Sequence, residues 1–298
     1  MNRMARRNAG FGLVELLIVI VILTVMVVLL MPVLARTQEG VRRKQCADNL
    51  RQLAQVHRMF AAENNGMWVP RMVPYHLEYS EIRPCWSSFD GAMVYPDYFK
   101  NHMIVLCLSD EEYEGEVSID SFMRPVHGTW QDAPDPNPVR GLAQYPETSD
   151  VSYVYWGYAI DPADVVTKED MVAIGRYLDS LDGPSINLRS RFEDHTITKP
   201  STGEELTLYR FQEGVERLVF PEVTDPVELE KKRASIAVMW DTIRTDMGVP
   251  TKEYNHGTGG NVLFMDGHVE YRMYPQDSGG PFWMLSEPAH MEGVTEFP

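Results

Sequence analysis

One long apolar segment near the N-terminus dominates the hydropathy pattern of the chain. Between Leu16 and Met31 only Thr24 is polar, and Glu15 is the one charged residue in the stretch 11–34. At about 1.5 Å of rise per helical residue, a helix of this length crosses the roughly 30 Å hydrocarbon core of a bilayer. The pattern therefore predicts a transmembrane helix over residues 11–34.

Beyond this segment the apolar positions recur with helical spacing. They fall at i, i+4, i+7, i+11 and i+14, which share one face of a helix, and are Cys46, Leu50, Leu53, His57 and Phe60. Asn64, Asn65 and Gly66 then form a C-terminal stop signal. We expect an amphipathic continuation of the helix over residues 35–66, with its apolar face packed against a globular domain.

Short strand patterns and long loops share the remainder of the chain. Runs rich in β-branched, aromatic or aliphatic residues predict short strands, at 103–108, 151–158, 206–211 and 236–241. Residues 162–181 can form a helix, and the stretches 69–144 and 184–204 are expected to be mainly loops. The expected fold class is α+β, with the long N-terminal helix packed on an antiparallel sheet and loop-rich insertions in a domain of residues 67–298.

The C-terminal pattern predicts a β-hairpin within residues 256–273. Asp266 and Gly267 lie between two strand-like runs, and an Asp-Gly pair favours a two-residue type I′ turn. Such a turn pairs Phe264 with Val269. We expect this pair on the core face of the hairpin.

Charge is divided unevenly along the chain. The 298 residues carry a net charge of −16, yet residues 1–60 hold nine Lys/Arg against three Asp/Glu. Residues 61–298 hold 18 Lys/Arg and 40 Asp/Glu, a net charge of −22. So acidic a domain is unsuited to binding nucleic acid through a basic face. It fits a solvated surface outside the cytoplasm.

The residues before the apolar segment form a short motif. A basic leader of residues 1–10 ends at Gly10, followed by Phe11 and, five positions after the glycine, Glu15. The leader arginines predict a cytoplasmic N-terminus. An uncleaved signal anchor and a secretory signal peptide are the simpler alternatives. A secretory signal places its small residue after a shorter apolar core, whereas Gly10 comes before the core.

This arrangement resembles the N-terminus of type IV prepilins and of type II secretion pseudopilins. The resemblance implies that a prepilin peptidase cleaves between Gly10 and Phe11 and methylates the new Phe11 amine. It also implies that Glu15 helps to seat the subunit in a filament, opposite the N-terminal amine of a neighbour. Pro32 falls where many members of this family place a helix-kinking proline.

Two further motifs resemble those of a large bacterial subgroup of these proteins. Residues 46–53 carry the pattern C-x-x-N-L-x-Q-L, and nine residues separate His256 from Asp266-Gly267, as in an H-X9-DG element. The resemblance touches both ends of the chain and much of residues 205–275. It covers residues 70–200 poorly.

The three cysteines are Cys46, Cys85 and Cys107. In an exported domain they favour one disulfide and one spare thiol, and three pairings are open. Cys46 lies on the helix face turned toward the domain and Cys107 closes a strand-like run, which favours the Cys46–Cys107 pair. Three free buried thiols are the alternative.

His256, Asp266 and His268 are candidate metal ligands, with Asp241 nearby, because His and Asp at the mouth of a hairpin can ligate a cation. In the structural alternative, which we favour, Asp266 forms the turn and His256 caps or bridges neighbouring loops. We therefore expect no metal and no other cofactor. The sequence contains no zinc-protease helix, nucleophile elbow or glycine-rich phosphate loop, so we expect no enzymatic activity.

These features lead us to expect a pseudopilin-like filament subunit of a type II secretion-like system. Its expected partners are prepilin peptidase, other pilin-like subunits, the inner-membrane assembly platform and the membrane. It is expected to cross the cytoplasmic membrane once, with a cytoplasmic N-terminus and an exported C-terminal domain, periplasmic or at the cell surface. The alternatives are a minor type IV pilin for adhesion or DNA uptake, and a membrane-tethered enzyme or carbohydrate-binding protein exported by the prepilin route.

Overall fold

The computed structural model describes residues 12–71, 89–94, 97–107, 109, 153–161, 167, 169–170, 173–174, 177–178, 192–241, 243–246, 249–254, 256 and 259–273. The chain divides into two compact units, Met1–Val41 and Arg42–Pro298. Helix α1 (Leu13–Glu63) contributes to both units. The strands of the described residues all belong to the second unit.

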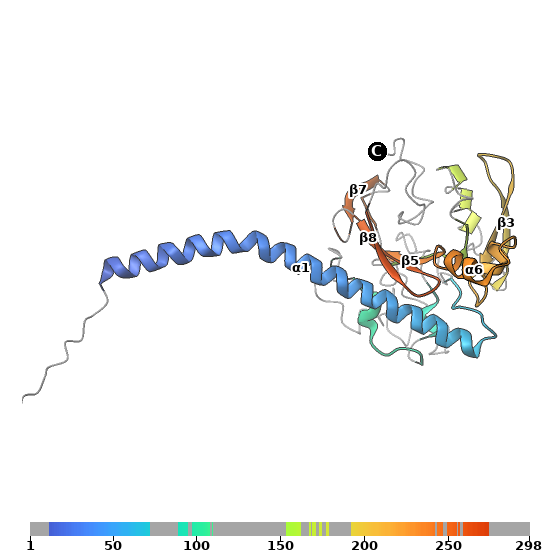
Figure 1. Cartoon of the computed structure of the whole chain (residues 1–298), viewed down its shortest axis with the longest axis horizontal. Coiled ribbons are helices and arrows are strands. Elements are labelled where there is room, and N and C mark those ends of the chain that lie inside the picture. Colours follow the sequence, from blue (N-terminus) through green and yellow to red (C-terminus); the bar gives the residue numbers. More distant parts are fainter. Residues whose placement is uncertain are drawn as a thin grey trace, which may run out of the picture. The chain divides into compact units, whose positions relative to one another are not determined.

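Helix α1 is continuous from the apolar segment into the second unit (Figure 1). It ends where the sequence predicts a stop, because Asn65 and Gly66 take φ values of 56° and 81°. Glycine adopts this left-handed conformation without a steric penalty, and asparagine tolerates it. The Gly66 amide donates to the carbonyl of Ala61 at 2.9 Å, which satisfies one of the last helical carbonyls.

The second unit is built on an antiparallel sheet with strand order β1-β5-β8-β9, of which β5 and β8 are labelled in Figure 1. Its strands are β1 (Tyr153–Tyr155), β5 (Ala237–Asp241), β8 (Gly259–Phe264) and β9 (Val269–Met273). The strands predicted at 151–158 and 236–241 are confirmed as β1 and β5. The first is shorter than expected because Gly157, at a φ of 80°, redirects the chain into a different sheet.

That second sheet has the order β2-β4-β3 and is also antiparallel. It contains β2 (Tyr158–Ala159), β3 (His195–Thr198) and β4 (Glu205–Arg210). Strand β4 confirms the strand predicted at 206–211, whereas β3 corrects the loop expected over 184–204. A separate ribbon pairs β6 (Ile243–Asp246) with β7 (Val249–Tyr254).

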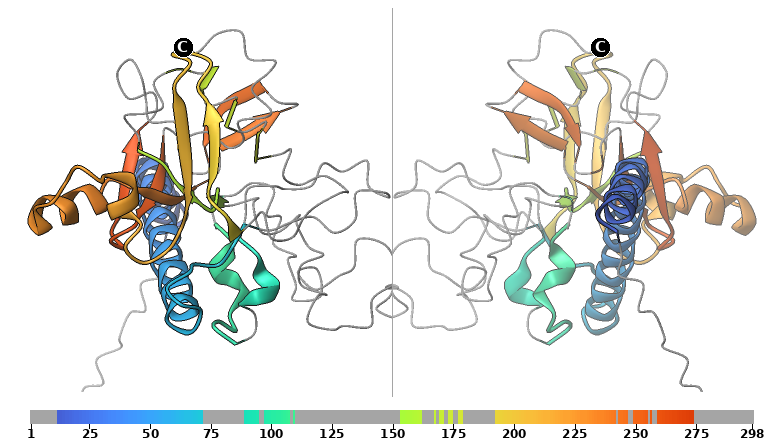
Figure 2. Two further views of the ribbon diagram at one scale, coloured as in Figure 1. Left: turned by 90° about the vertical axis from the view of Figure 1, so that its right-hand side faces the viewer. Right: turned by 90° about the vertical axis from the view of Figure 1, so that its left-hand side faces the viewer.

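Short helical segments complete the described part of the chain. They are the 3-10 helices η1 (Gly91–Met93) and η2 (His102–Val105), and the α-helices α5 (Glu216–Val219) and α6 (Pro226–Arg233). None of the residues of α6 is buried, and this helix stands out from the rest of the unit (Figure 2). Its start is readable in the sequence, because Asp225 caps it and proline follows at the first helical position.

Two local predictions between residues 100 and 181 have different outcomes. The strand predicted at 103–108 is wrong, because Asn101 accepts a hydrogen bond from the Met103 amide at 3.1 Å and starts η2 instead. Within the predicted helix 162–181, the described positions 169–170, 173–174 and 177–178 are helical. Thr167 forms a bend, and the remaining residues of the predicted helix lie outside the described part of the chain.

Two apolar cores cover the two faces of the first sheet. Alternating side chains of β8 divide between them, with Leu263 in one core and Val262 and Phe264 in the other. The first core holds the predicted apolar face of α1, and its buried members include Cys46, Leu50, Leu53 and Phe60. The second core holds side chains of the β2-β4-β3 sheet, such as Tyr158, Ile197, Leu206 and Leu208. The α+β arrangement predicted from the sequence is thus present.

The β8–β9 hairpin is present, but its turn differs from the predicted one. Phe264 pairs with His268, since the Phe264 amide donates to the His268 carbonyl at 3.0 Å. The Gly267 amide donates to the Phe264 carbonyl at 2.8 Å. The loop therefore has three residues, and Val269 lies opposite Leu263 rather than Phe264. The predicted register was wrong by one residue.

The physical reason lies in the backbone that each turn requires. A type I′ turn needs positive φ at both central residues, whereas a three-residue turn needs it at one residue only, which here is the glycine. Gly267 has a φ of 94°, and Asp266 is not among the described residues with positive φ. The Asp266 carboxylate also accepts from the His268 amide at 2.9 Å, a bond typical of aspartate in turns.

Replacing Gly267 by valine should lower the free energy of unfolding by about 1–3 kcal/mol, because the new side chain must adopt strained backbone angles. Its Cβ would also lie 2.9 Å from a guanidinium nitrogen of Arg58. Urea unfolding of the full-length protein in detergent measures the effect. Gly267→Asn is the matched control, since asparagine tolerates positive φ. Equal stability of the two variants would contradict this account.

Candidate functional site

The N-terminal unit contains a helix cap formed by the glutamate of the motif. The backbone amide of Gly12 donates to Glu15 Oε2 at 2.9 Å, and the Leu16 amide donates to the Gly12 carbonyl at 3.1 Å. Glu15 therefore occupies the third helical position and satisfies the amide of the capping residue, as in a capping box. The helix dipole also favours a carboxylate at this end. Gly10 and Phe11 lie outside the described residues.

The apolar part of α1 is exposed along its whole length. Leu13–Met31 is long and apolar enough to cross a membrane by length and composition, and none of this span is buried. Among its large apolar side chains, exposure runs from 41% at Val19 to 81% at Leu13. So large an apolar surface marks a membrane or protein contact in a native protein. The helical backbone continues through Pro32.

In the second unit, the C-x-x-N-L pattern fixes α1 to the segment that ends at Cys107. Cys46 and Cys107 form a disulfide with their Cα atoms 5.3 Å apart. One turn further along, the Asn49 side-chain amide donates to the carbonyls of Leu106 at 2.9 Å and Met103 at 3.3 Å. The pattern therefore has a local structural meaning, because its cysteine and its asparagine hold the same short segment.

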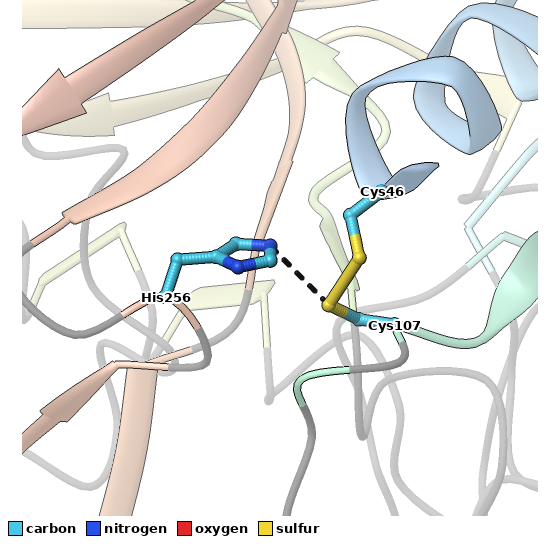
Figure 3. A group of neighbouring side chains, drawn as sticks. All are labelled: Cys46, Cys107 and His256. Atoms are coloured by element: carbon cyan, nitrogen blue, oxygen red, sulfur yellow. Dashed lines mark hydrogen bonds between the residues drawn. A yellow bond between two sulfur atoms is a disulfide. The ribbon is translucent and has the colours of Figure 1, made fainter. Parts of the chain in front are cut away.

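His256 reaches this disulfide from the other end of the sequence (Figure 3). Its side chain is buried, and its Nε2 lies 3.4 Å from Cys107 Sγ and 3.3 Å from Asp241 Oδ2. A disulfide sulfur can only accept a hydrogen bond. With a disulfide sulfur and a carboxylate as its neighbours, Nε2 is assigned the ring hydrogen, and this N–H lies within reach of both acceptors. The histidine of the H-X9-DG pattern therefore lies beside the disulfide that the cysteine of the C-x-x-N-L pattern forms.

Asp241, at the end of β5, is the second neighbour of His256 Nε2. Its Oδ2 accepts from the backbone amide of Asn261 at 2.7 Å and from the side-chain amide at 2.8 Å. The same Asn261 side chain donates to the Arg43 carbonyl at 3.2 Å. Burial raises the pKa of Asp241 to about 6, against the opposing effects of His256, the Asn261 hydrogen bonds and Arg43.

The Asp-Gly half of the H-X9-DG pattern, Asp266 and Gly267, lies at the β8–β9 turn, away from His256. Asp266 Oδ1 is 2.6 Å from His268 Nδ1, and the His268 ring stacks on Phe264 with 4.5 Å between ring centroids. His256 precedes β8 and Asp266 follows it, so the six residues of that strand separate them by about 20 Å. The structure therefore does not bring the candidate ligands His256, Asp266 and His268 together, whereas Asp241 does contact His256.

Asn49 and Asn261 are the residues of this region that the sequence did not single out for a role. Asn49 belongs to the C-x-x-N-L-x-Q-L motif, but the two carbonyl groups that it contacts are more than fifty residues away in the sequence. Asn261 interrupts an otherwise apolar strand and is buried. A buried polar residue in a strand needs a hydrogen-bond partner, and an asparagine within an apolar run is the signal that could have identified it.

Comparison with known protein families identifies the N-terminal segment. Residues 5–31 match the family model described as the prokaryotic N-terminal methylation motif. No curated protein and no solved structure matches the chain. The matched segment includes Gly10, Phe11 and Glu15 and most of the apolar span of α1. The chain thus carries a prepilin-type methylation motif on an apolar helix, which supports a type IV pilin-like protein with a single membrane anchor, processed by a prepilin peptidase.

Proposed function

We propose that this protein is a filament subunit of the pseudopilin type in a type II secretion-like system. The observation that carries the proposal is the methylation motif at residues 5–31, followed by an exposed apolar helix and an α+β unit. A filament buries such helices against one another, so the exposed surface of Leu13–Met31 becomes its packing surface. No catalytic activity is assigned to the chain.

In this proposal the protein has two successive states. The precursor lies in the cytoplasmic membrane, with residues 1–10 on the cytoplasmic side and the second unit exported. Prepilin peptidase then removes the leader and methylates the amine of Phe11. The inner-membrane assembly platform moves the mature subunit into the filament, where it contacts other pilin-like subunits through α1.

The size and charge of the second unit favour a specialised place in the filament as the second candidate. Residues 61–298 carry a net charge of −22, and neighbouring copies of so acidic a surface would repel one another. A minor or tip subunit, present in few copies, avoids this repulsion. A minor type IV pilin has the same requirements.

The processing step can be tested by intact mass spectrometry of the protein purified from membranes. We expect a mature chain that begins at Phe11 and carries the additional mass of one methyl group. Gly10→Val should remain at full length, because the bulkier residue blocks the cleavage position. Gly12→Ala is the control, since it changes a glycine two residues beyond the cut. A mature N-terminus at any other residue would contradict the assignment.

A further inference from the structure

We propose that, in the dithiol state of the protein, Cys46, Cys107, His256 and Asp241 hold one divalent cation of the zinc class. The site is independent of the filament role and lies wholly in the second unit. Its residues Cys46 on α1, Cys107 and His256 lie together in Figure 3, and Asp241 joins them from the end of β5. The Cys46–Cys107 disulfide and the bound ion are alternative states of the same side chains.

The spacing of the ligand atoms fits a tetrahedral site. The Sγ atoms of both cysteines and a ring nitrogen of His256 all lie within 4.8 Å of one another. Zinc bonds of about 2.0–2.3 Å at tetrahedral angles place ligand atoms roughly 3.3–3.8 Å apart. The His256–Cys107 distance is 3.4 Å and the His256–Asp241 distance is 3.3 Å. Once reduced, the two sulfurs need only separate to complete the set.

Asp241 supplies the independent indication of a ligand. Its side chain is buried, and its Oδ1 has no hydrogen-bond partner within the described part of the chain. Leaving a carboxylate oxygen buried and unsatisfied is costly, and a cation on this carboxylate removes that cost. The two bonds from Asn261 to Oδ2 orient the carboxylate in the way outer partners orient metal ligands.

The charge around the site can also be balanced. Two thiolates, one carboxylate and a divalent cation sum to one negative charge. Arg43 lies next to the site, since the Asn261 side chain donates both to its carbonyl and to Asp241 Oδ2, and its guanidinium stacks over Tyr271 with 3.9 Å to the ring centroid. Its buried Nε has no hydrogen-bond partner among the described residues. The arginine thus offers the compensating positive charge that a buried site needs.

The two states are connected by balanced chemistry. A dithiol reductant gives two electrons and two protons to the Cys46–Cys107 bond, and the reductant becomes a disulfide. Binding of the cation then releases one proton from each of the two thiols, while the hydrogen of His256 moves from Nε2 to Nδ1. Two thiolates with one imidazole and one carboxylate form a donor set typical of zinc.

The test uses the full-length protein in detergent. It is unfolded with urea in the presence of dithiothreitol, which reduces the disulfide, and is then refolded with Zn²⁺ or Co²⁺ under argon. We expect about one zinc per chain after desalting, and a thiolate-to-cobalt charge-transfer band with the cobalt form. The oxidised protein should take up no metal. Asn261→Ala should weaken zinc binding by about 10–100-fold, as loss of an outer partner does, and His256→Ala should abolish stoichiometric binding.

His268→Ala and Cys85→Ser are the matched controls, because they remove a histidine and a thiol outside the proposed ligand set. Both should bind zinc as the parent protein does. The proposal is overturned if reduced, refolded parent protein binds no zinc, or if His268→Ala or Cys85→Ser loses the metal. If His256→Ala fails to refold, the cobalt spectrum of the parent protein decides, and absence of the thiolate-to-cobalt band refutes the site.

Discussion

Replacing Glu15 by leucine should leave a processed, membrane-inserted protein that enters filaments at least tenfold less often, a loss of about 1.4 kcal/mol or more. In a filament the neighbouring helices exclude water from this carboxylate, and the cation proposed to meet it is the Phe11 amine of an adjacent subunit. A buried charge is stable only when it is paired. Cross-linking to the major subunit, scaled to the amount of processed protein, measures incorporation.

The helix cap at Glu15 allows the role of its charge to be separated from its role in the helix. Glutamine can still accept the Gly12 amide, since both Glu and Gln serve at the third position of a capping box, but it carries no charge. Glu15→Gln should therefore fail in assembly like Glu15→Leu. If the glutamine variant assembles normally and the leucine variant does not, the carboxylate acts only as a cap. Normal assembly of both removes Glu15 from the assembly mechanism.

The Cys46→Ser/Cys107→Ser double variant should be about 4 kcal/mol less stable than the parent protein under oxidising conditions. The disulfide joins residues 61 positions apart, and closing a loop of this size restricts the unfolded chain by about that free energy in the chain-entropy treatment. Since a domain is typically stable by only about 5–15 kcal/mol, the loss is large. Urea unfolding in the presence of EDTA measures it without a contribution from bound metal.

Two further unfolding measurements serve as controls for the double variant. Cys85→Ser should unfold like the parent protein, because it leaves the Cys46–Cys107 bond in place. The parent protein in dithiothreitol should lose about as much stability as the double variant. If the double variant is as stable as the oxidised parent, the disulfide contributes nothing to stability, and its loop is held by other contacts such as those of Asn49.

The parts of the fold that the sequence predicts are those that local patterns determine. The apolar run and the helical spacing of Cys46 to Phe60 define α1, and Asn65 and Gly66 end it through their own backbone preferences. Strand β5 can be predicted from its own apolar residues, without knowledge of the strands that pair with it. The hairpin can likewise be predicted from Asp266 and Gly267. This pair fits turns of two lengths, however, and the predicted register was wrong because it assumed the two-residue turn.

The site in the second unit is beyond such local signals. Cys107 and His256 are 149 positions apart, and their contact depends on how α1, η2 and the sheet pack. Spacing within the H-X9-DG element suggests that His256 and Asp266 act together, whereas a strand separates them. Strand β3 was missed for a related reason: its two exposed threonines alternate with only two buried residues, one of them the polar His195. It is a strand because β4 pairs with it.

The Cys46–Cys107 bond also sets the mechanical behaviour of the subunit. In the filament proposed above, tension would run along the packed helices, and in this chain α1 continues from the apolar segment into the second unit without a break. Tension that travels along α1 meets a covalent cross-link only four residues after that unit begins at Arg42. The pull passes there to the segment at Cys107, so α1 cannot be drawn out of its domain by the rupture of hydrogen bonds alone.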